Sequence, residues 1–468
     1  MPIRAAAPIV DAVLGCLDGG GSVCLVEGPS GTGKTRVLQE AARQAAELGA
    51  VVLRATGSDS ESGLPLGIVE QLLGPAPLDP ADARRVAGLL ECAEPTAEVR
   101  QGLCRVLLAL AGRRPVVICV DDMQHADAAS LQCLSYLARR TGGVRLSLLL
   151  TELVVARQPH PLFRTEILDL RNGRQFRLRP LSERDTAGVV GQQLGTGPAR
   201  RLAARFHALS GGNPLLLGAL IDDYRAAPTP FDLDAAAGET YAQAIISCLY
   251  RAGDATRTVA GAVAVLGESA CPRLVAELLG IDAPAVSRSA DVLTEAGVLD
   301  AGRWRHERAR LAALGTLTAD ARAALHARVA AILHDEGADP VEVAGHLAQG
   351  GVTPPSWARP VLHDAVMQTL GVGDYAAASS FVRLAERASG EAAAAVPFPG
   401  PEAGAALSEA EQRVAALAAS GHTNRQIAAK LFITMSTVEQ HLTRIYRKLR
   451  VTRRDQLPGT LSPLSNTA

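Results

Sequence analysis

The stretch "VCLVEGPSGTGKTRVLQEAARQAAEL", residues 23–48, decides the fold of the first part of this chain. It opens with a short apolar run, turns at Gly28 and continues from Lys34 with apolar residues at helical spacing. The turn, "GPSGTGKT", matches the phosphate-loop pattern G-x-x-x-x-G-K-[ST] in the strand, loop and helix order that the pattern requires. The sequence therefore predicts a P-loop NTPase domain built on a parallel sheet.

The residue types in this loop suit phosphate groups. Its glycines let the backbone N–H groups point at a β-phosphate, and the following helix presents its positive dipole end. Lys34 is expected at the β- and γ-phosphates, and Thr35 is expected to give a hydroxyl to Mg²⁺. ATP or ADP with Mg²⁺ is the predicted ligand. The predicted nucleotide-binding loop consists of Gly28, Pro29, Ser30, Gly31, Thr32, Gly33, Lys34 and Thr35.

Two further apolar runs predict buried strands, "VVICVDD" at 116–122 and "VRLSLLL" at 144–150. A magnesium ion in such a domain needs a carboxylate at the carboxyl end of a neighbouring strand, so Asp121 is the predicted ligand, acting through water. Asp122 is the candidate that polarises an attacking water. An equal alternative for Asp122 is a helix N-cap or first-turn acid.

The end of the third predicted strand favours slow hydrolysis. Thr151 and Glu152 stand where a γ-phosphate sensor would place a polar or cationic side chain. Arg157 and Arg164 follow in a stretch that we interpret as a loop with solvated arginines. The sequence thus predicts that nucleotide is bound and at most slowly hydrolysed, as a regulatory switch.

Beyond about residue 180 the pattern is mainly helical. "GGNP" at 211–214 forces a break between two helices, and "GVLDAGRWRH" at 297–306 follows two helices as a hairpin, the order of a winged helix. Residues 272–300 carry a net charge of −3, which argues against binding to a phosphate backbone. We therefore expect a structural arm here, followed by one helical pair and a proline-broken linker.

The predicted fold class is multidomain, with α/β and all-α parts. The predicted segments are a P-loop NTPase core at 1–180, a helical subdomain at 181–238, a winged-helix-like arm at 239–345, a helical pair at 346–388, a linker at 389–404, a helix-turn-helix domain at 405–457 and a tail at 458–468.

The segment "TVEQHLTRIYRKL", residues 437–449, predicts an amphipathic helix. Its apolar stripe consists of Val438, Leu442, Ile445 and Leu449. Upstream, Ser408 with Glu411 and Thr423 with Gln426 stand at capping-box spacing, so two short helices are expected before it. Three helices in this order are the layout of a helix-turn-helix unit, whose last helix enters the major groove.

The charge of this region supports double-stranded DNA as its partner. Residues 424–454 hold eight Lys or Arg against one Glu, a net charge of +7, in a chain whose net charge is −1. The alternative is a solvated basic face on a helix that only packs. We expect outward side chains near the amino end to read bases and those near the carboxyl end to hold phosphates. The candidate DNA-binding residues are Lys430, Thr437, Gln440, His441, Arg444, Arg447 and Lys448.

The eight cysteines form no CxxC pair, which predicts buried, reduced thiols rather than a metal site. Asp11 interrupts the apolar start of the chain, so we expect no signal peptide. No stretch reaches the roughly eighteen apolar residues of a membrane span, and the expected location is the cytoplasm.

Two stretches resemble the large ATP-binding regulators of the LuxR family. "LSEAEQRVAALAASGHTNRQIAAKLFITMSTVEQHLTRIYRKLRV", residues 407–451, is similar to their DNA-binding domain, and "VDDMQHADAASLQCLSYLARR", residues 120–140, resembles their acidic strand and following helix. The resemblance implies a STAND P-loop NTPase, in which Pro214 contacts the base and His306 approaches the phosphates from the winged helix. Such proteins usually carry a long region of helical repeats, which is reduced here to one pair.

By that resemblance the chain is a cytoplasmic transcription activator of secondary metabolism, with RNA polymerase and self-association as further partners. ATP or ADP occupancy would set the position of the DNA-binding domain. Two alternatives stay open. A P-loop ATPase or phosphotransferase would need an acceptor site and a lid. An AAA-like replication or remodelling ATPase would need an arginine acting in trans and rapid turnover.

Overall fold

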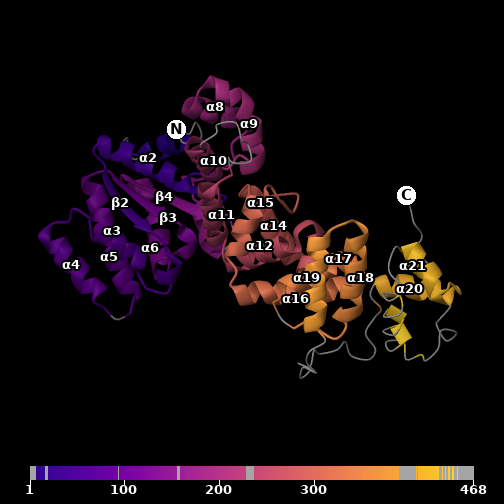
Figure 1. The fold of residues 1–468 in the computed structure, drawn as a ribbon. Coiled ribbons are helices and arrows are strands. Elements are labelled where there is room, and N and C mark those ends of the chain that lie inside the picture. Colours follow the sequence, from indigo (N-terminus) through magenta and orange to yellow (C-terminus); the bar gives the residue numbers. More distant parts are fainter. Residues whose placement is uncertain are drawn as a thin grey trace. The chain divides into compact units, whose positions relative to one another are not determined.

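The computed structural model describes residues 7–15, 19–92, 94–154, 159–227, 237–351, 353–388, 407 and 409–431, and then 435, 438, 441–442, 445–446, 449 and 451 (Figure 1). The chain divides into two compact units. The first unit is Met1–Ala276 with Ile281–Thr316, and the second unit is Glu277–Gly280 with Leu317–Ala468. The division falls inside the predicted arm, and the limits of the predicted segments stay predictions.

A five-stranded parallel sheet forms the centre of the first unit, in the order β2-β3-β4-β1-β5. The three predicted strands are confirmed as β1, β3 and β4. Strands β2 and β5 were not predicted. The apolar run of β2 ends already at Arg54, and β5 is mostly polar. The strands are β1 (Val23–Gly28), β2 (Val51–Thr56), β3 (Val116–Asp121), β4 (Leu146–Leu153) and β5 (Gly173–Arg177).

Helices cover both faces of this sheet (Figure 1). Side chains alternate along a strand, so Cys24 and Val26 of β1 pack under α1 and α2, whereas Val23 and Leu25 pack under the helices of the opposite face. The first face carries α1 (Ala7–Leu14) and α2 (Lys34–Glu47). The opposite face carries α3 (Gly67–Leu73), α4 (Pro80–Leu90), α5 (Ala97–Arg113), α6 (Ala128–Ala138) and α7 (Pro161–Leu168).

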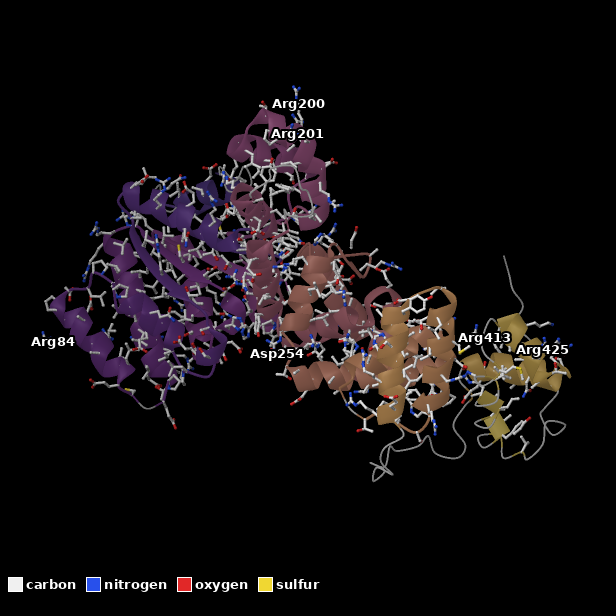
Figure 2. The ribbon with its side chains drawn as sticks, viewed as in Figure 1. Arg84, Arg200, Arg201, Asp254, Arg413 and Arg425 are labelled. Atoms are coloured by element: carbon white, nitrogen blue, oxygen red, sulfur yellow. The ribbon has the colours of Figure 1, made fainter. Side chains whose placement is uncertain are left out.

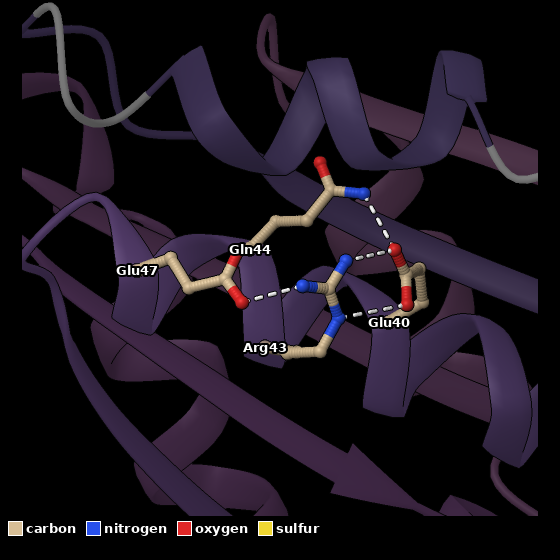
Figure 3. Close-up of polar contacts among 4 residues, drawn as sticks. All are labelled: Glu40, Arg43, Gln44 and Glu47. Atoms are coloured by element: carbon tan, nitrogen blue, oxygen red, sulfur yellow. Dashed lines mark hydrogen bonds and ion pairs between the residues drawn. The ribbon is translucent and has the colours of Figure 1, made fainter.

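Helix α2 begins at the end of the phosphate loop and is held on both of its sides. Its inner side buries Val37, Leu38 and three alanines against the sheet. On its outer side Arg43 Nε donates to Glu40 at 3.1 Å, and Gln44 donates to the same carboxylate at 2.7 Å (Figure 3). Such exposed pairs contribute only about 0.3–0.5 kcal/mol each, so apolar burial is what fixes α2 and the loop before it.

Among the described residues after β5, the first unit consists of helices and one hairpin. The predicted break at "GGNP" is confirmed, because α9 ends at Ser210 and α10 starts at Pro214. The predicted order of two helices and a hairpin is also confirmed, with β6 and β7 antiparallel. These elements are α8 (Glu183–Leu194), α9 (Thr196–Ser210), α10 (Pro214–Ala226), α11 (Glu239–Arg251), α12 (Asp254–Leu266), α13 (Pro272–Leu279), α14 (Ala283–Glu295), β6 (Leu299–Asp300), β7 (Arg303–Trp304) and α15 (Glu307–Gly315).

The second unit begins with four helices, each packed on the next along the chain. The predicted helical pair is α18 and α19, joined by a turn in which Asp374 caps α19. The capping box at Thr423 is confirmed: its N–H donates to Gln426 Oε1 at 2.8 Å, and the Gln426 N–H donates back to Oγ1 at 3.3 Å. The helices are α16 (Ala319–Glu336), α17 (Pro340–Gln349), α18 (Ala358–Gly371), α19 (Tyr375–Arg387), α20 (Glu409–Ala419) and α21 (Asn424–Leu431).

Some predicted features lie outside the described residues. These are the linker 389–404, the cap residue Ser408 and the tail 458–468. Between residues 435 and 449 every described position is helical, as predicted for the last helix.

The described cysteines are all free thiols, and five of the seven are buried. The expectation of buried thiols is wrong for Cys92, which is exposed just after α4, and Cys271 is half-buried. Within the described part of the chain, no helix combines the length and the apolar character needed to cross a bilayer.

The pairing of two histidines predicts a pH dependence for the second unit. His326 Nδ1 and His346 Nδ1 lie 2.9 Å apart, and burial lowers the pKa of His346 from 6.5 to about 4. The folded state therefore binds fewer protons than the unfolded state between these values. We expect the unit to lose on the order of 3 kcal/mol of stability as the pH falls from 6.5 to 4.

Urea unfolding followed by Trp357 fluorescence, in a Trp304→Phe background, measures this effect. Trp357 stacks on His334 within the same unit at 4.3 Å between ring centroids. The variant His346→Gln cannot titrate and should flatten the pH dependence. An equally steep dependence in that variant would contradict the assignment to His346.

Candidate nucleotide site and DNA-binding segment

The phosphate loop adopts a conformation that its glycines make possible. Gly31 and Gly33 have φ angles of 79° and 96°, in the left-handed region that favours glycine. A Cβ on Gly31 would lie 2.5 Å from Asn213 Oδ1, so glycine is also required by space. Gly33 is the residue before α2, and its φ lets the helix begin with its N–H groups facing the loop.

Lys34 folds back on the loop that precedes it. Its Nζ is buried and donates to the Gly28 carbonyl at 2.9 Å and the Pro29 carbonyl at 3.0 Å. Burial lowers the pKa of Lys34 to about 8, against the opposing charges of Asp122 and Asp121. Thr32 Oγ1 donates to the same Pro29 carbonyl at 2.8 Å. The lysine is thus held at the centre of the loop.

The two predicted magnesium ligands lie side by side. Thr35 Oγ1 donates to Asp121 Oδ2 at 2.7 Å. The other carboxylate oxygen of Asp121 accepts from Thr151 Oγ1, whose own oxygen accepts from the Asp122 N–H at 3.0 Å. The sequence placed Thr151 near the end of the third predicted strand without foreseeing its bond to Asp121, which depends on the pairing of β3 with β4.

Asp122 does not act as a helix cap. It has a φ of 50°, unusual for a residue with a side chain, and its carboxylate makes no cap hydrogen bond to the short helix that follows. Instead Oδ1 accepts from Gln124 Nε2 at 3.1 Å, and Gln124 Oε1 accepts from the Leu153 N–H at 3.1 Å. The side chain borders the pocket next to Lys34, and its catalytic role stays a prediction.

A cavity of about 520 Å³ lies over the loop, a volume within the usual range for ligand pockets of about 300–1,000 Å³. The lining consists of Ser30, Gly31, Gly33, Lys34, Thr35, Arg36, Gln39, Asp122, Gln124, His125, Leu153, Pro214, Leu215 and Arg251.

Of the two residues that the family resemblance assigned to the nucleotide, the structure brings only Pro214 to the cavity. His306 is not among the described residues that line it. Its Nδ1 accepts from the Arg308 N–H at 3.1 Å as the cap of α15, and its ring meets Tyr241 edge to face at 6.5 Å between centroids. The His306 ring thus lies at the capping position before α15, and its approach to the phosphates stays a prediction.

Asn213 joins three parts of the first unit, and sequence reasoning did not single it out. Its side chain is fully buried. The amide nitrogen donates to the Ser30 carbonyl of the phosphate loop at 2.8 Å and to the Ala296 carbonyl after α14 at 2.7 Å. Its Oδ1 accepts from the Leu215 N–H at 2.9 Å and caps α10. The conformation of the loop is thus tied to α10 and to the segment before the hairpin.

We expected Arg164 to be a solvated loop arginine, and this expectation is wrong. It lies on α7, and its guanidinium pairs with Glu27 at 2.5 Å and with Glu152 at 2.7 Å. These glutamates are register partners at the ends of β1 and β4, on the sheet face opposite α2. Burial raises the pKa of Glu152. Arg164 neutralises two adjacent buried carboxylates, while Arg157 lies outside the described residues.

The DNA-binding segment has an apolar centre in which Val414, Ile427, Val438, Leu442 and Ile445 pack together. His441 was expected to point outward, but it is 2% exposed. The reason is helical spacing: position 441 lies three residues after Val438 and four before Ile445, so it belongs to the buried stripe. His441 is therefore corrected from a base-reading to a packing residue.

Described basic side chains of this segment are exposed on its first two helices. Arg413 lies on α20 and Arg425 on α21 (Figure 2). Lys430 also lies on α21. Lys430 Nζ lies 2.7 Å from His422 Nε2. Sequence reasoning missed Arg413, because it precedes the segment whose charge was counted. The predicted residues Thr437, Gln440, Arg444, Arg447 and Lys448 lie outside those whose side chains the structure describes.

The role of Asn213 is open to a stability measurement. The variant Asn213→Ala removes a helix cap and leaves two buried carbonyls without their donor, so we expect a loss of about 2–4 kcal/mol. Asn213→Asp keeps the oxygen that caps α10 but replaces the donating nitrogen with a second oxygen, which repels both carbonyls. We expect it to lower stability at least as much as Asn213→Ala. Ser182→Ala, which removes the cap of α8 and an exposed hydrogen bond to Asp185, is the control and should cost about 1 kcal/mol. Equal losses in Asn213→Ala and Ser182→Ala by urea unfolding would contradict the bridging role.

Two stretches of the chain match known families. Residues 7–151 match the AAA ATPase domain, and residues 405–458 match the bacterial regulatory proteins of the luxR family. An uncharacterized protein of Rhizobium meliloti (strain 1021) is 27% identical over 332 residues, which are 61% of this chain. The chain covers 31% of the length of that relative.

Two solved structures are similar over long stretches. One is a Signal Transduction ATPase with Numerous Domains (STAND) protein with a tetratricopeptide repeat sensor from Pyrococcus horikoshii, at 10% identity and a TM-score of 0.33, covering 94% of this chain and 64% of that one. The other is the Thermotoga maritima RuvB Holliday junction branch migration motor, at 14% identity and a TM-score of 0.35, covering 64% and 89%. At such TM-scores neither likeness carries an argument here.

The family matches agree with the phosphate loop and with the basic helical segment at the two ends of the chain. This chain therefore carries an AAA ATPase domain and a DNA-binding domain of the bacterial LuxR regulatory family, the combination typical of ATP-binding LuxR-type regulators.

Proposed function

We propose that this chain is an ATP-dependent transcription regulator that binds double-stranded DNA through residues 405–457. The observation that carries the proposal is the presence, in one chain, of a phosphate loop that borders a nucleotide-sized cavity and a LuxR-type domain with a local charge of +7. A metabolic phosphotransferase does not need a LuxR-type DNA-binding domain.

The residues around the loop suit ATP or ADP with Mg²⁺. The N–H groups of the loop can donate hydrogen bonds to a phosphate group, and Lys34 lies beside them. Thr35 and Asp121 would hold Mg²⁺, because a hydroxyl and a carboxylate oxygen are ligands that this ion prefers. Bound Mg²⁺ would neutralise phosphate charge. Asp122 is the proposed residue for orienting water if hydrolysis occurs.

Nucleotide acts as a switch only if ATP and ADP favour different arrangements of the chain. Asn213 supports such a switch in the first unit, because one amide holds both the phosphate loop and the segment before the hairpin. A shift of the Ser30 carbonyl would change the position of that amide and therefore the start of α10.

Further parts of the proposal come from the resemblance and from the chemistry of the partners. DNA and ATP as ligands support a location in the bacterial cytoplasm. Activation of secondary-metabolism genes, contact with RNA polymerase and self-association stay predictions.

Nucleotide binding is tested with Lys34→Ala. Removing the ammonium group takes away the charge at the centre of the loop, so ATP affinity should fall at least about tenfold, since a hydrogen bond to a charged group contributes about 1.5–3 kcal/mol. Calorimetry on the full chain measures it. Lys430→Ala removes the same charge from the second unit and should leave ATP affinity unchanged. Equal affinities of wild type and Lys34→Ala would remove the basis for a nucleotide switch.

DNA binding is tested with two kinds of substitution in the last helix. Lys448→Ala should weaken binding to all duplexes about equally and flatten the salt slope by roughly one unit. Gln440→Ala or Arg444→Ala should instead change the preference between sequences by roughly 1–3 kcal/mol. Titration of selected and scrambled duplexes by fluorescence anisotropy measures both.

Arg84→Ala is the matched control, since Arg84 is an exposed arginine of α4 in the first unit (Figure 2). It should leave the salt slope unchanged. If a chain that ends at residue 404 binds duplex DNA as tightly as the full chain, the DNA-binding surface lies elsewhere and the proposal fails.

A further inference from the structure

Two segments of the chain hold a large excess of positive charge. The DNA-binding segment 424–454 carries a net charge of +7. Residues 171–210, which belong to the first unit, hold eight arginines against two acids, a net charge of +6. Since the whole chain has a net charge of −1, all the remaining residues together carry −14. The arginines of 171–210 therefore stand out from an otherwise acidic unit, and none of them lines the nucleotide cavity.

Residues 171–210 form the edge strand of the sheet, β5, and the hairpin of helices α8 and α9. Helix α8 packs along α9, and Thr186 Oγ1 of α8 lies 3.0 Å from His207 Nδ1 of α9. Between Asp185 and Asp222 the chain has no acidic residue. The arginines of α9 therefore have no carboxylate beside them along the sequence of the hairpin.

All eight arginines of this segment are exposed. Arg200 and Arg201 lie at the outer end of the hairpin (Figure 2). Arg177 forms an exposed ion pair with Glu295 at 2.8 Å, and Arg201 and Arg205 have other interactions within the chain. The side chains of the other five make no hydrogen bond or ion pair with any described residue, and these are Arg171, Arg174, Arg179, Arg184 and Arg200.

Stability does not explain this concentration of charge. An exposed ion pair contributes only about 0–1 kcal/mol, and like charges on one part of a fold repel each other. Five exposed cations without a partner instead fit a polyanion. Such a partner neutralises several arginines at once, and its condensed counterions are released into the solution.

Duplex DNA is the polyanion that the rest of the chain favours. Once the LuxR-type domain at residues 405–458 holds its site, the flanking duplex is at a high effective concentration for other surfaces of the same chain. The hairpin also has a suitable length, because the 12 residues of α8 span about 18 Å, the length of about five base pairs. The alternative partner is an acidic protein, whose binding does not depend on DNA.

We propose that the arginines of residues 171–210 form a second DNA-binding surface, which contacts the phosphate backbone beside the site held by the LuxR-type domain. Contacts of this kind fix the position of a protein on a duplex without reading its sequence. The surface adds affinity for longer DNA and brings the nucleotide-binding unit onto the duplex. This inference rests on the proposed function, because the LuxR-type domain must first hold the chain at a site.

The test measures binding of the full chain to two duplexes by fluorescence anisotropy over a range of salt concentrations. One duplex contains only the selected site, and the other extends it on each side by about three helical turns, roughly 30 base pairs. Wild type should bind the extended duplex more tightly and with a steeper salt slope. Arg184→Gln combined with Arg200→Gln should lower affinity for the extended duplex about tenfold or more at about 0.1 M salt and flatten the slope by about one to two units. Affinity for the short duplex should change by less than about twofold.

Arg84→Gln combined with Arg85→Gln is the matched control, because it removes two exposed arginines from α4 of the same unit. It should leave binding to both duplexes unchanged. Arg184→Lys combined with Arg200→Lys keeps both charges and should retain most of the wild-type slope. This variant separates the loss of charge from a loss of structure.

The inference is overturned if the double glutamine variant at 184 and 200 binds the extended duplex as the control does, and an acidic protein is then the partner that fits the surface. An equal loss for the short and the extended duplex also contradicts it, because the lost contact is then not with flanking DNA. If wild type binds neither duplex, the proposed function fails as well. Should the double variant not fold, an unchanged slope in both single variants, Arg184→Gln and Arg200→Gln, counts against the second surface.

Discussion

The hydrogen bonds of one buried amide hold the first unit together around its cavity. Asn213 donates to the Ser30 carbonyl and to the Ala296 carbonyl and caps α10 with its oxygen. A buried amide that loses any of these partners leaves polar groups unsatisfied at a cost of about 1–3 kcal/mol each. The two glycines that approach Asn213 most closely, Gly31 and Gly297, have no room for a side chain. The close approach of loop, helix and hairpin segment is therefore a consequence of this one junction.

At the carboxyl edge of the sheet, the two faces carry different polar groups. On the face covered by α2, Thr35 and Thr151 bond to the two oxygens of Asp121. On the opposite face, Glu27 and Glu152 are neutralised by Arg164 from α7. Alternation along β1 and β4 produces this separation, since adjacent residues of a strand point to opposite faces. One face thus offers oxygen ligands to a metal ion. On the other face, the ion pairs of Arg164 hold α7 to the sheet.

The helical part of the first unit contributes to the cavity at two points, Pro214 at the start of α10 and Arg251 at the end of α11. Both helices are anchored by side chains that bond to backbone: Asn213 in one case and Asp223 in the other. A bound ligand would therefore contact elements whose positions depend on each other. This arrangement is suited to a switch, because differential contacts with two ligands can shift the population of such elements. The DNA-binding segment, by contrast, has its own apolar centre around Val438 and Ile445.

Local chemistry in the sequence determined much of this protein. The phosphate loop, three of the five strands, the break at "GGNP", the hairpin at 299–304 and the capping box at Thr423 all depend on neighbouring residues, and each could be predicted. The polar strand β5 carries no such local signal. Tertiary structure alone decided which distant groups meet: Arg164 with two glutamates, Asn213 with the loop, and Arg251 with the cavity. His441 differs from these cases, because its spacing from Val438 and Ile445 already assigns it to the apolar stripe that the structure buries. Periodicity is set by bonds along the chain, whereas the partner of a buried polar group is set by the fold that brings the two together.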